Sequence, residues 1–169
     1  IVDSIVEILF QLHRDPSLPR CRGKLPIRVL LEGGDDVTAL VRPDLAVPFT
    51  RAILSNFEAR TAASEMVGPL KAAAGIAVVK SKAPVLAGVD LAGSLLKEAK
   101  TAGRDSSRAS FYLASGGIPI DLNRDRSTNF RSAGQDSLTA WPRTITEIET
   151  LLSRASFVCG DLPRSHVRS

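Results

Sequence analysis

Apolar residues near the start of the chain follow two different periods. Ile1, Ile5, Ile8 and Leu12 are three or four positions apart, which predicts an amphipathic helix that ends near Arg14. A loop containing three prolines and a glycine follows. From position 27, branched residues alternate in "IRVLLE" and "VTALV", with "GGDD" between them. This pattern predicts two strands joined by a tight turn, so a β-hairpin is expected after the first helix.

The middle of the chain predicts two long helices that alternate with two strands. Pro43 suits the first turn of a helix, and Asp44 favours the N-terminus of that helix. "KAAAGIAVVK" predicts a strand whose small residues let another backbone come close. Pro84 opens the second long helix, and Gly103 is a candidate cap at its end. "SRASFYLA" then predicts a short strand.

The C-terminal part predicts one more helix, within "LTAWPRTITEIETLLSRAS". Glu147 stands three residues after Thr144, which is the spacing of a capping box at a helix start. The apolar stripe of this helix consists of Ile145, Ile148, Leu151 and Leu152. Residues 115–137 are polar and contain glycine, and their pattern favours neither a helix nor a strand.

This order of elements predicts an α+β fold, with one antiparallel sheet and helices packed on one face. The ferredoxin-like order βαββαβ matches if one strand precedes Ile1. Ile1 falls inside a helical pattern, and the final "LPRSHVRS" resembles the beginning of an element. We therefore expect a piece of a longer protein, cut at both ends. Residues 1–114 form the expected domain, and residues 115–169 form an extension that packs on it and ends in a truncated element.

Composition narrows the class of protein. A chain of 169 residues that is 44% hydrophobic is long enough to bury a core. No apolar run approaches the roughly 20 residues that span a bilayer. Neither Cys21 nor Cys159 belongs to a CxxC motif, and His13 and His166 are not spaced as zinc ligands with them. Two reduced thiols in a cytoplasmic protein are therefore expected. The net charge of +4 suits an anionic ligand without specifying one.

The "GGDD" turn allows two interpretations. Gly-Gly and Asp-Gly pairs are common in hairpin turns, because glycine adopts positive φ without steric cost, so the four residues could be purely structural. Alternatively, adjacent carboxylates on a sharp turn could both face an open site and bind Mg²⁺ together with substrate phosphates. Two such ions could activate a hydroxyl and stabilise a leaving pyrophosphate. That chemistry needs another carboxylate and cations that meet a triphosphate.

Candidate cations lie at the end of the second long helix. Lys100 and Arg104 are four residues apart, so they are expected to share a helix face. They could instead serve only as cations at a helix C-terminus, where positive charge is favoured. Lys80 and Lys82 follow a predicted strand and are expected to be solvated loop lysines.

Three segments together resemble a known family. "LPIRVLLEGGDDVTALV", "AAAGIAVVKSKAPV" and "LLKEAKTAGRD" are similar in order and spacing to the palm domain of the large polymerase subunit of type III CRISPR effector complexes. More distantly, they resemble the GGDEF diguanylate cyclases. The resemblance covers roughly residues 25–105. "WPRT", within the predicted C-terminal helix region, is similar to a tail segment of palm-like proteins of this kind.

The resemblance implies a ferredoxin-like palm that is an enzyme as part of a full-length protein. The implied reaction joins nucleoside triphosphates, ATP foremost, into cyclic oligonucleotides such as cyclic oligoadenylate during antiviral defence. It implies a metal-binding and catalytic pair, with Mg²⁺ or Mn²⁺ as cofactor, at Asp35 and Asp36. It implies nucleotide binding at Gly33, Gly34, Lys100 and Arg104. It also implies a second palm or a homodimer, effector subunits and guide or target RNA as partners, without a membrane.

Two departures from the family pattern leave alternatives open. The "EF" of the diguanylate cyclases is "DV" here, at Asp36 and Val37, which favours the CRISPR-type palm over a diguanylate cyclase relative. The family's first strand carries another metal-binding carboxylate, which would stand before Ile1, since Asp3 lies in the predicted helix. A palm that binds nucleotides or partner proteins without turnover, as a scaffold of an RNA-guided complex, is the alternative function.

Overall fold

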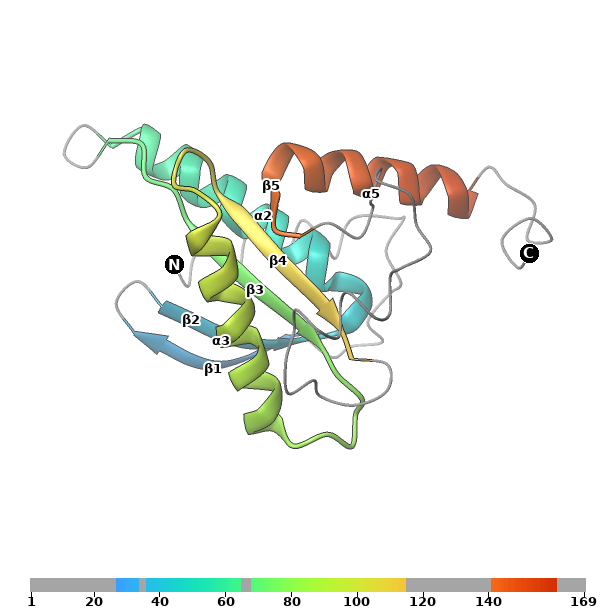
Figure 1. Cartoon of the computed structure of the whole chain (residues 1–169). Coiled ribbons are helices and arrows are strands. Elements are labelled where there is room, and N and C mark those ends of the chain that lie inside the picture. Colours follow the sequence, from blue (N-terminus) through green and yellow to red (C-terminus); the bar gives the residue numbers. More distant parts are fainter. Residues whose placement is uncertain (1–26, 34–35, 65–67, 115–140, 161–169) are drawn as a thin grey trace.

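The computed structural model describes residues 27–33, 36–64, 68–114 and 141–160, with side chains of the last helix described to residue 155. The predicted helix before Arg14 lies outside the described residues. So do Cys21, His13, His166 and the side chain of Cys159. The elements, in chain order, are β1 (Ile27–Gly33), β2 (Asp36–Val41), α2 (Pro43–Ala62), β3 (Ala73–Val78), α3 (Val85–Thr101), β4 (Arg108–Leu113), β5 (Arg143–Thr144) and α5 (Ile145–Gly160) (Figure 1).

The described strands form two small sheets, and the α+β class is confirmed. β1 and β2 pair antiparallel as the predicted hairpin. The second sheet has the order β3-β4-β5, in which β3 and β4 run parallel and β5 pairs antiparallel with β4. The parallel pair differs from the all-antiparallel sheet expected from sequence. It arises because α3 crosses over the sheet and returns the chain in the same direction, as parallel strands require.

Helices cover both faces of the three-stranded sheet, whereas one face was expected. Ile76 of β3 packs with Leu54 of α2 and Ile148 of α5. On the opposite face, Tyr112 of β4 packs with Leu95 of α3. Figure 1 shows α3 on one side of β3 and β4, and α2 and α5 on the other. This arrangement follows from the strands themselves, because alternate residues point to opposite faces and β3 carries small or apolar residues on both.

α3 lies unusually close to β3. A Cβ atom added at Gly75 would stand 2.1 Å from the carbonyl oxygen of Ala92 and 2.5 Å from the backbone nitrogen of Leu96. The expected close approach of a backbone to the small-residue strand is therefore confirmed. A hydrogen bond from the buried Ser110 hydroxyl to the Glu98 carboxylate further joins β4 to α3. These contacts fix α3 on the sheet.

The hairpin is attached to the rest of the fold at its base. The buried Phe49 of α2 packs against Ile27 and Val41, which pair with each other at the open end of the hairpin. Farther out, apolar side chains remain in contact with solvent: Leu31 is 58% exposed and Leu40 is 44% exposed. The closed end of the hairpin therefore projects from a packed base.

α5 begins with the predicted capping box. The Glu147 carboxylate accepts hydrogen bonds from the Thr144 backbone N–H (2.8 Å) and hydroxyl (2.9 Å). An ion pair between Arg51 and Glu149 (3.1 Å) joins α2 to α5. The division into residues 1–114 and 115–169 stays a prediction. In the part of the chain that the structure describes, none of the helices combines the length and apolar character that crossing a bilayer requires.

Candidate functional site

The hairpin closes where the acidic motif was predicted. Gly33 pairs with Asp36, which leaves two residues between the paired ends, the length that favours a tight hairpin turn. Those two residues, Gly34 and Asp35, lie outside the described residues. Asp36 is exposed, and apart from Gly33 and its chain neighbours no atom of the described residues lies within 4 Å of where a Cβ of Gly33 would stand. The described end of the hairpin is therefore open to a ligand on the side of Gly33.

A β-bulge separates the base of the hairpin from its closed end. Val29 pairs with Ala39 on the base side and Leu31 pairs with Thr38 on the outer side, so Leu30 has no partner in the ladder. Bulges bend a strand and redirect the side chains beyond them, and they are common beside active sites. Sequence reasoning missed this feature, although three consecutive apolar residues in "VLLE" break the alternation of a regular strand.

Lys100 and Arg104 are placed differently from the prediction. Lys100 lies in the last turn of α3, and Arg104 lies in the loop that follows; both are exposed. The expectation that they share a helix face is wrong, because α3 ends at Thr101 and the chain turns away at Gly103. The φ angle of Gly103 is +149°, a conformation that favours glycine. Gly103 therefore ends the helix, as predicted.

Asp36, the described member of the predicted acidic pair, is not bonded to the predicted cationic residues. Among the described residues, no hydrogen bond or ion pair joins Asp36 to Lys100 or Arg104. The described ranges also contain no group of three or more His, Cys, Asp or Glu side chains able to hold a metal ion. The donor chemistry of the hairpin nevertheless fits a divalent cation, because Asp36 is an exposed carboxylate beside an open glycine, and Mg²⁺ prefers such oxygen ligands.

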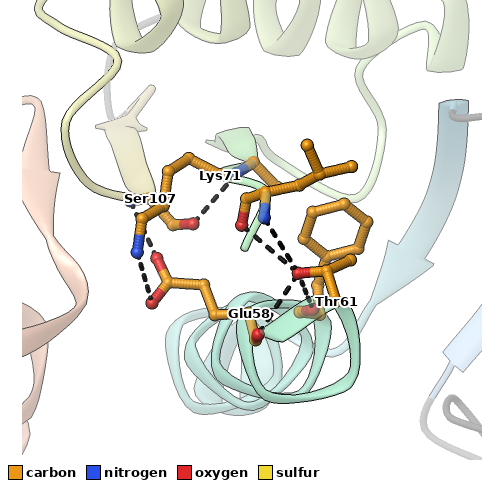
Figure 2. Close-up of polar contacts among 7 residues, drawn as sticks. Glu58, Thr61, Lys71 and Ser107 are labelled. Atoms are coloured by element: carbon orange, nitrogen blue, oxygen red, sulfur yellow. Dashed lines mark hydrogen bonds and ion pairs between the residues drawn. The ribbon is translucent and has the colours of Figure 1, made fainter. Parts of the chain in front are cut away.

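A polar junction around Ser107 is a second feature that sequence reasoning missed (Figure 2). Ser107 is fully buried. Its backbone N–H donates to Oε1 of Glu58 (3.0 Å), and its Oγ accepts the backbone N–H of Ala72 (2.9 Å). Its carbonyl oxygen accepts the backbone N–H of Ile145 (3.3 Å). One residue thereby connects α2, the segment before β3, and the start of α5.

Two further side chains complete this junction. Lys71 Nζ lies 3.1 Å from Oε2 of Glu58, and the Thr61 hydroxyl accepts the backbone N–H of Leu70 (3.1 Å). Burial raises the pKa of the Glu58 carboxyl, but hydrogen bonds from Ser107 and the nearby Lys71 ammonium outweigh burial, so the pKa is lowered. Glu58 and Ser107 are 49 positions apart, so no local pattern in the sequence brings them together.

An ion pair joins the loop between α3 and β4 to the start of β4, beside this junction. Arg108 Nη2 lies 2.9 Å from Oδ1 of Asp105, and the Arg108 backbone N–H donates to the carbonyl oxygen of Ala72 (3.1 Å). The hydrogen bond from Arg108 lowers the pKa of the Asp105 carboxyl. Asp105 therefore stays ionised at neutral pH beside the exposed Arg104.

Comparison with known proteins gives one family match. A family model described as Cas10/Cmr2, second palm domain, matches residues 5–108, which is more than half of the chain. The matched range includes the hairpin, β3, α3 and the loop with Arg104. Neither a curated protein nor a solved structure matches the chain.

Proposed function

Because the chain belongs to the Cas10/Cmr2 second palm domain family, we propose that it is a metal-dependent nucleotidyltransferase palm of a type III CRISPR large subunit. The proposed reaction joins nucleoside triphosphates, ATP foremost, into cyclic oligonucleotides. A ribose hydroxyl of one nucleotide forms a bond to the α-phosphorus of another, and the bond to pyrophosphate breaks. Cyclic oligoadenylate is the proposed product in antiviral defence.

The observation that supports this proposal is the open, acidic end of the hairpin. The antiparallel pair of Gly33 and Asp36 places a carboxylate on the exposed edge of a turn, with free space above the glycine. Asp35 and Asp36 would hold Mg²⁺ or Mn²⁺, and Gly33 and Gly34 would let a nucleotide come close to the backbone. A divalent ion bound there would polarise the phosphate oxygens.

Two exposed cations provide the proposed phosphate contacts. Lys100 and Arg104 carry positive charge that would neutralise the β- and γ-phosphates as pyrophosphate leaves. Arg104 suits this role because its planar guanidinium donates two parallel hydrogen bonds to a phosphate. A carboxylate on the strand expected before Ile1 and a second palm or another copy would complete the site. Effector subunits with guide or target RNA are the proposed further partners, and a cytoplasmic location is part of this proposal.

Product analysis of the full-length protein tests this function. The protein is incubated with each nucleoside triphosphate and Mg²⁺ or Mn²⁺, and the products are identified by mass spectrometry. The test variant carries Asp35→Asn and Asp36→Asn. The matched control is Glu32→Gln, because Glu32 is also exposed but occupies the neighbouring pair of the ladder and the opposite face of the hairpin.

Each outcome assigns a different function. A cyclic adenylate that disappears in the double variant and persists in Glu32→Gln supports the proposal. Aspartate-dependent ATP binding without product in any condition replaces it with a nucleotide-binding or scaffolding palm. A cyclic diguanylate made only from GTP replaces it with a diguanylate cyclase relative. If neither a product nor nucleotide binding is found, the motif is a structural turn.

A further inference from the structure

α2 connects the two groups of proposed site residues. Near its start, Phe49 packs on the base of the hairpin that carries Asp36. Near its end, Glu58 holds Ser107 at the far side of the loop that carries Arg104. Nine residues separate Phe49 from Glu58, so the two contact points lie about 14 Å apart along one rigid helix. The helix therefore relates the position of the acidic hairpin to that of the cationic loop.

The loop with Arg104 is held at both ends. At one end, α3 lies against β3 through the close approach at Gly75. At the other end, Ser107 is fully buried and bonded to Glu58, Ala72 and Ile145. Between these ends only the short stretch from Ala102 to Ser106 is left. Moving Ser107 would therefore move Arg104.

Glu58 is the one side chain in this junction that reaches Ser107 from α2. Its carboxylate accepts the Ser107 N–H on one oxygen and pairs with Lys71 on the other. The side chain is 27% exposed, so it is partly shielded from water. If the carboxylate were removed, a buried N–H would lose its acceptor, and the loop would have to move to satisfy that N–H. Figure 2 shows Ser107 and Lys71 both meeting the carboxylate of Glu58.

We propose that Glu58 is a positioning residue, which holds Ser107 so that Arg104 stands where it meets the phosphates of a bound nucleoside triphosphate. Glu58 does not touch the nucleotide itself. The proposal rests on the proposed function, because the role given to Arg104 is to bind the phosphates of a nucleoside triphosphate. It goes further by assigning a role to a residue on α2, far in sequence from both the hairpin and the loop.

Hydrogen exchange of the full-length protein tests the structural half without any ligand. In Glu58→Ala, amide exchange in residues 103–107 should rise about tenfold, because the Ser107 N–H loses its acceptor. Exchange across Leu91–Ala99 of α3 should stay unchanged. Glu58→Gln should resemble the wild type, because the amide oxygen still accepts that hydrogen bond. The matched control is Glu149→Ala, which breaks an ion pair of the same 3.1 Å length without touching Ser107.

Binding of ATP with Mg²⁺ tests the functional half. Glu58→Ala should raise the Kd for ATP about tenfold, the order expected when one charge-assisted phosphate contact is lost. The Kd for adenosine should not change, since adenosine has no phosphates. Arg104→Ala should weaken ATP binding by a similar factor. Combining it with Glu58→Ala should add little, because both changes remove the same contact.

The outcomes separate this inference from the proposed function. Faster exchange in the loop together with a non-additive loss of ATP affinity supports the positioning role. Unchanged exchange, unchanged ATP affinity, or fully additive losses would overturn it while leaving aspartate-dependent nucleotide binding intact. Equal losses for ATP and adenosine would assign Glu58 a purely structural role. Failure of the wild-type protein to bind any nucleotide would overturn the proposed function and the positioning role together.

Discussion

The hairpin and the β3-α3-β4 unit use glycine in opposite ways. Around Gly33 of the hairpin, a Cβ would meet no atom within 4 Å in the described part of the chain. At Gly75 of β3, a Cβ would stand 2.1 Å from the carbonyl oxygen of Ala92. The first glycine leaves space on the outside of the molecule, and the second removes volume so that a helix and a strand can touch. The same residue type thus serves access in one region and packing in the other.

This contrast extends to the apolar residues of each region. Leu95 of α3 is completely buried, whereas Leu31 of β1 is 58% exposed. The packed unit has a core of its own, in which Leu91, Leu95 and Tyr112 are buried together. Among the described residues, Phe49 holds the hairpin at its base, and apolar side chains farther out stay exposed. A packed unit that supports exposed strands is an arrangement on which a binding site can be built.

The largest expected difference in stability is between a variant of Gly75 and the same variant of Gly33. Gly75→Val should cost about 4 kcal/mol of unfolding free energy or prevent folding, because rigid backbone atoms occupy the space that the new side chain needs. Gly33→Val, the same change in the hairpin, should stay within about 1 kcal/mol of the wild type. Urea unfolding followed by circular dichroism measures both. Equal losses in the two variants would mean that packing does not distinguish the regions.

A smaller difference in stability is expected between variants of the buried Leu95 and the exposed Leu31. Leu95→Ala should destabilise the fold by about 3 kcal/mol, since it removes a buried side chain and leaves a cavity. Leu31→Ala should cost less than about 1 kcal/mol, because that side chain is already largely in water. Thermal unfolding of both variants under identical buffer conditions gives the difference. A large loss for Leu31→Ala would show that the outer hairpin is covered in solution.

The capping box of α5 predicts a moderate effect outside both regions. Thr144→Ala removes the hydroxyl that donates to Glu147, and should cost about 1 kcal/mol. Thr144→Ser keeps the hydroxyl and serves as the control. Chemical unfolding of the pair measures the cost. Equal stability of the two variants would contradict a stabilising role for this cap.

Acid should produce the smallest and most gradual change. Hydrogen bonds from the Thr144 backbone and side chain lower the pKa of Glu147, and the Glu58 pKa is lowered as described above. A carboxyl whose pKa is lower in the folded state stabilises the fold above its unfolded pKa, near 4.5 here. That stabilisation should disappear as the pH falls through the folded-state pKa. Unfolding free energies between pH 7 and pH 3 measure the loss.

Glu147→Gln is the matched variant for this pH dependence. It retains acceptors for the Thr144 hydrogen bonds but does not titrate, so the slope of stability against pH should be smaller than in the wild type. A wild-type slope in Glu147→Gln would assign the acid sensitivity to other carboxyls.

The sequence by itself determined the features that depend on neighbouring residues. Alternating branched residues around "GGDD" specify the hairpin, because side-chain period and turn chemistry are local. Thr144 and Glu147 specify the start of α5 for the same reason, and Gly103 specifies the end of α3. Gly75 marked the close approach, although not the helix that makes it. These predictions needed only residues within a few positions of one another.

Only the tertiary structure decided the features that join distant parts of the chain. The parallel pairing of β3 with β4, and the placement of helices on both faces, depend on the path that α3 takes across the sheet. The junction of Glu58, Lys71 and Ser107 joins residues up to 49 positions apart. Long-range contacts of this kind are set by how whole elements pack, and no local sequence pattern encodes them.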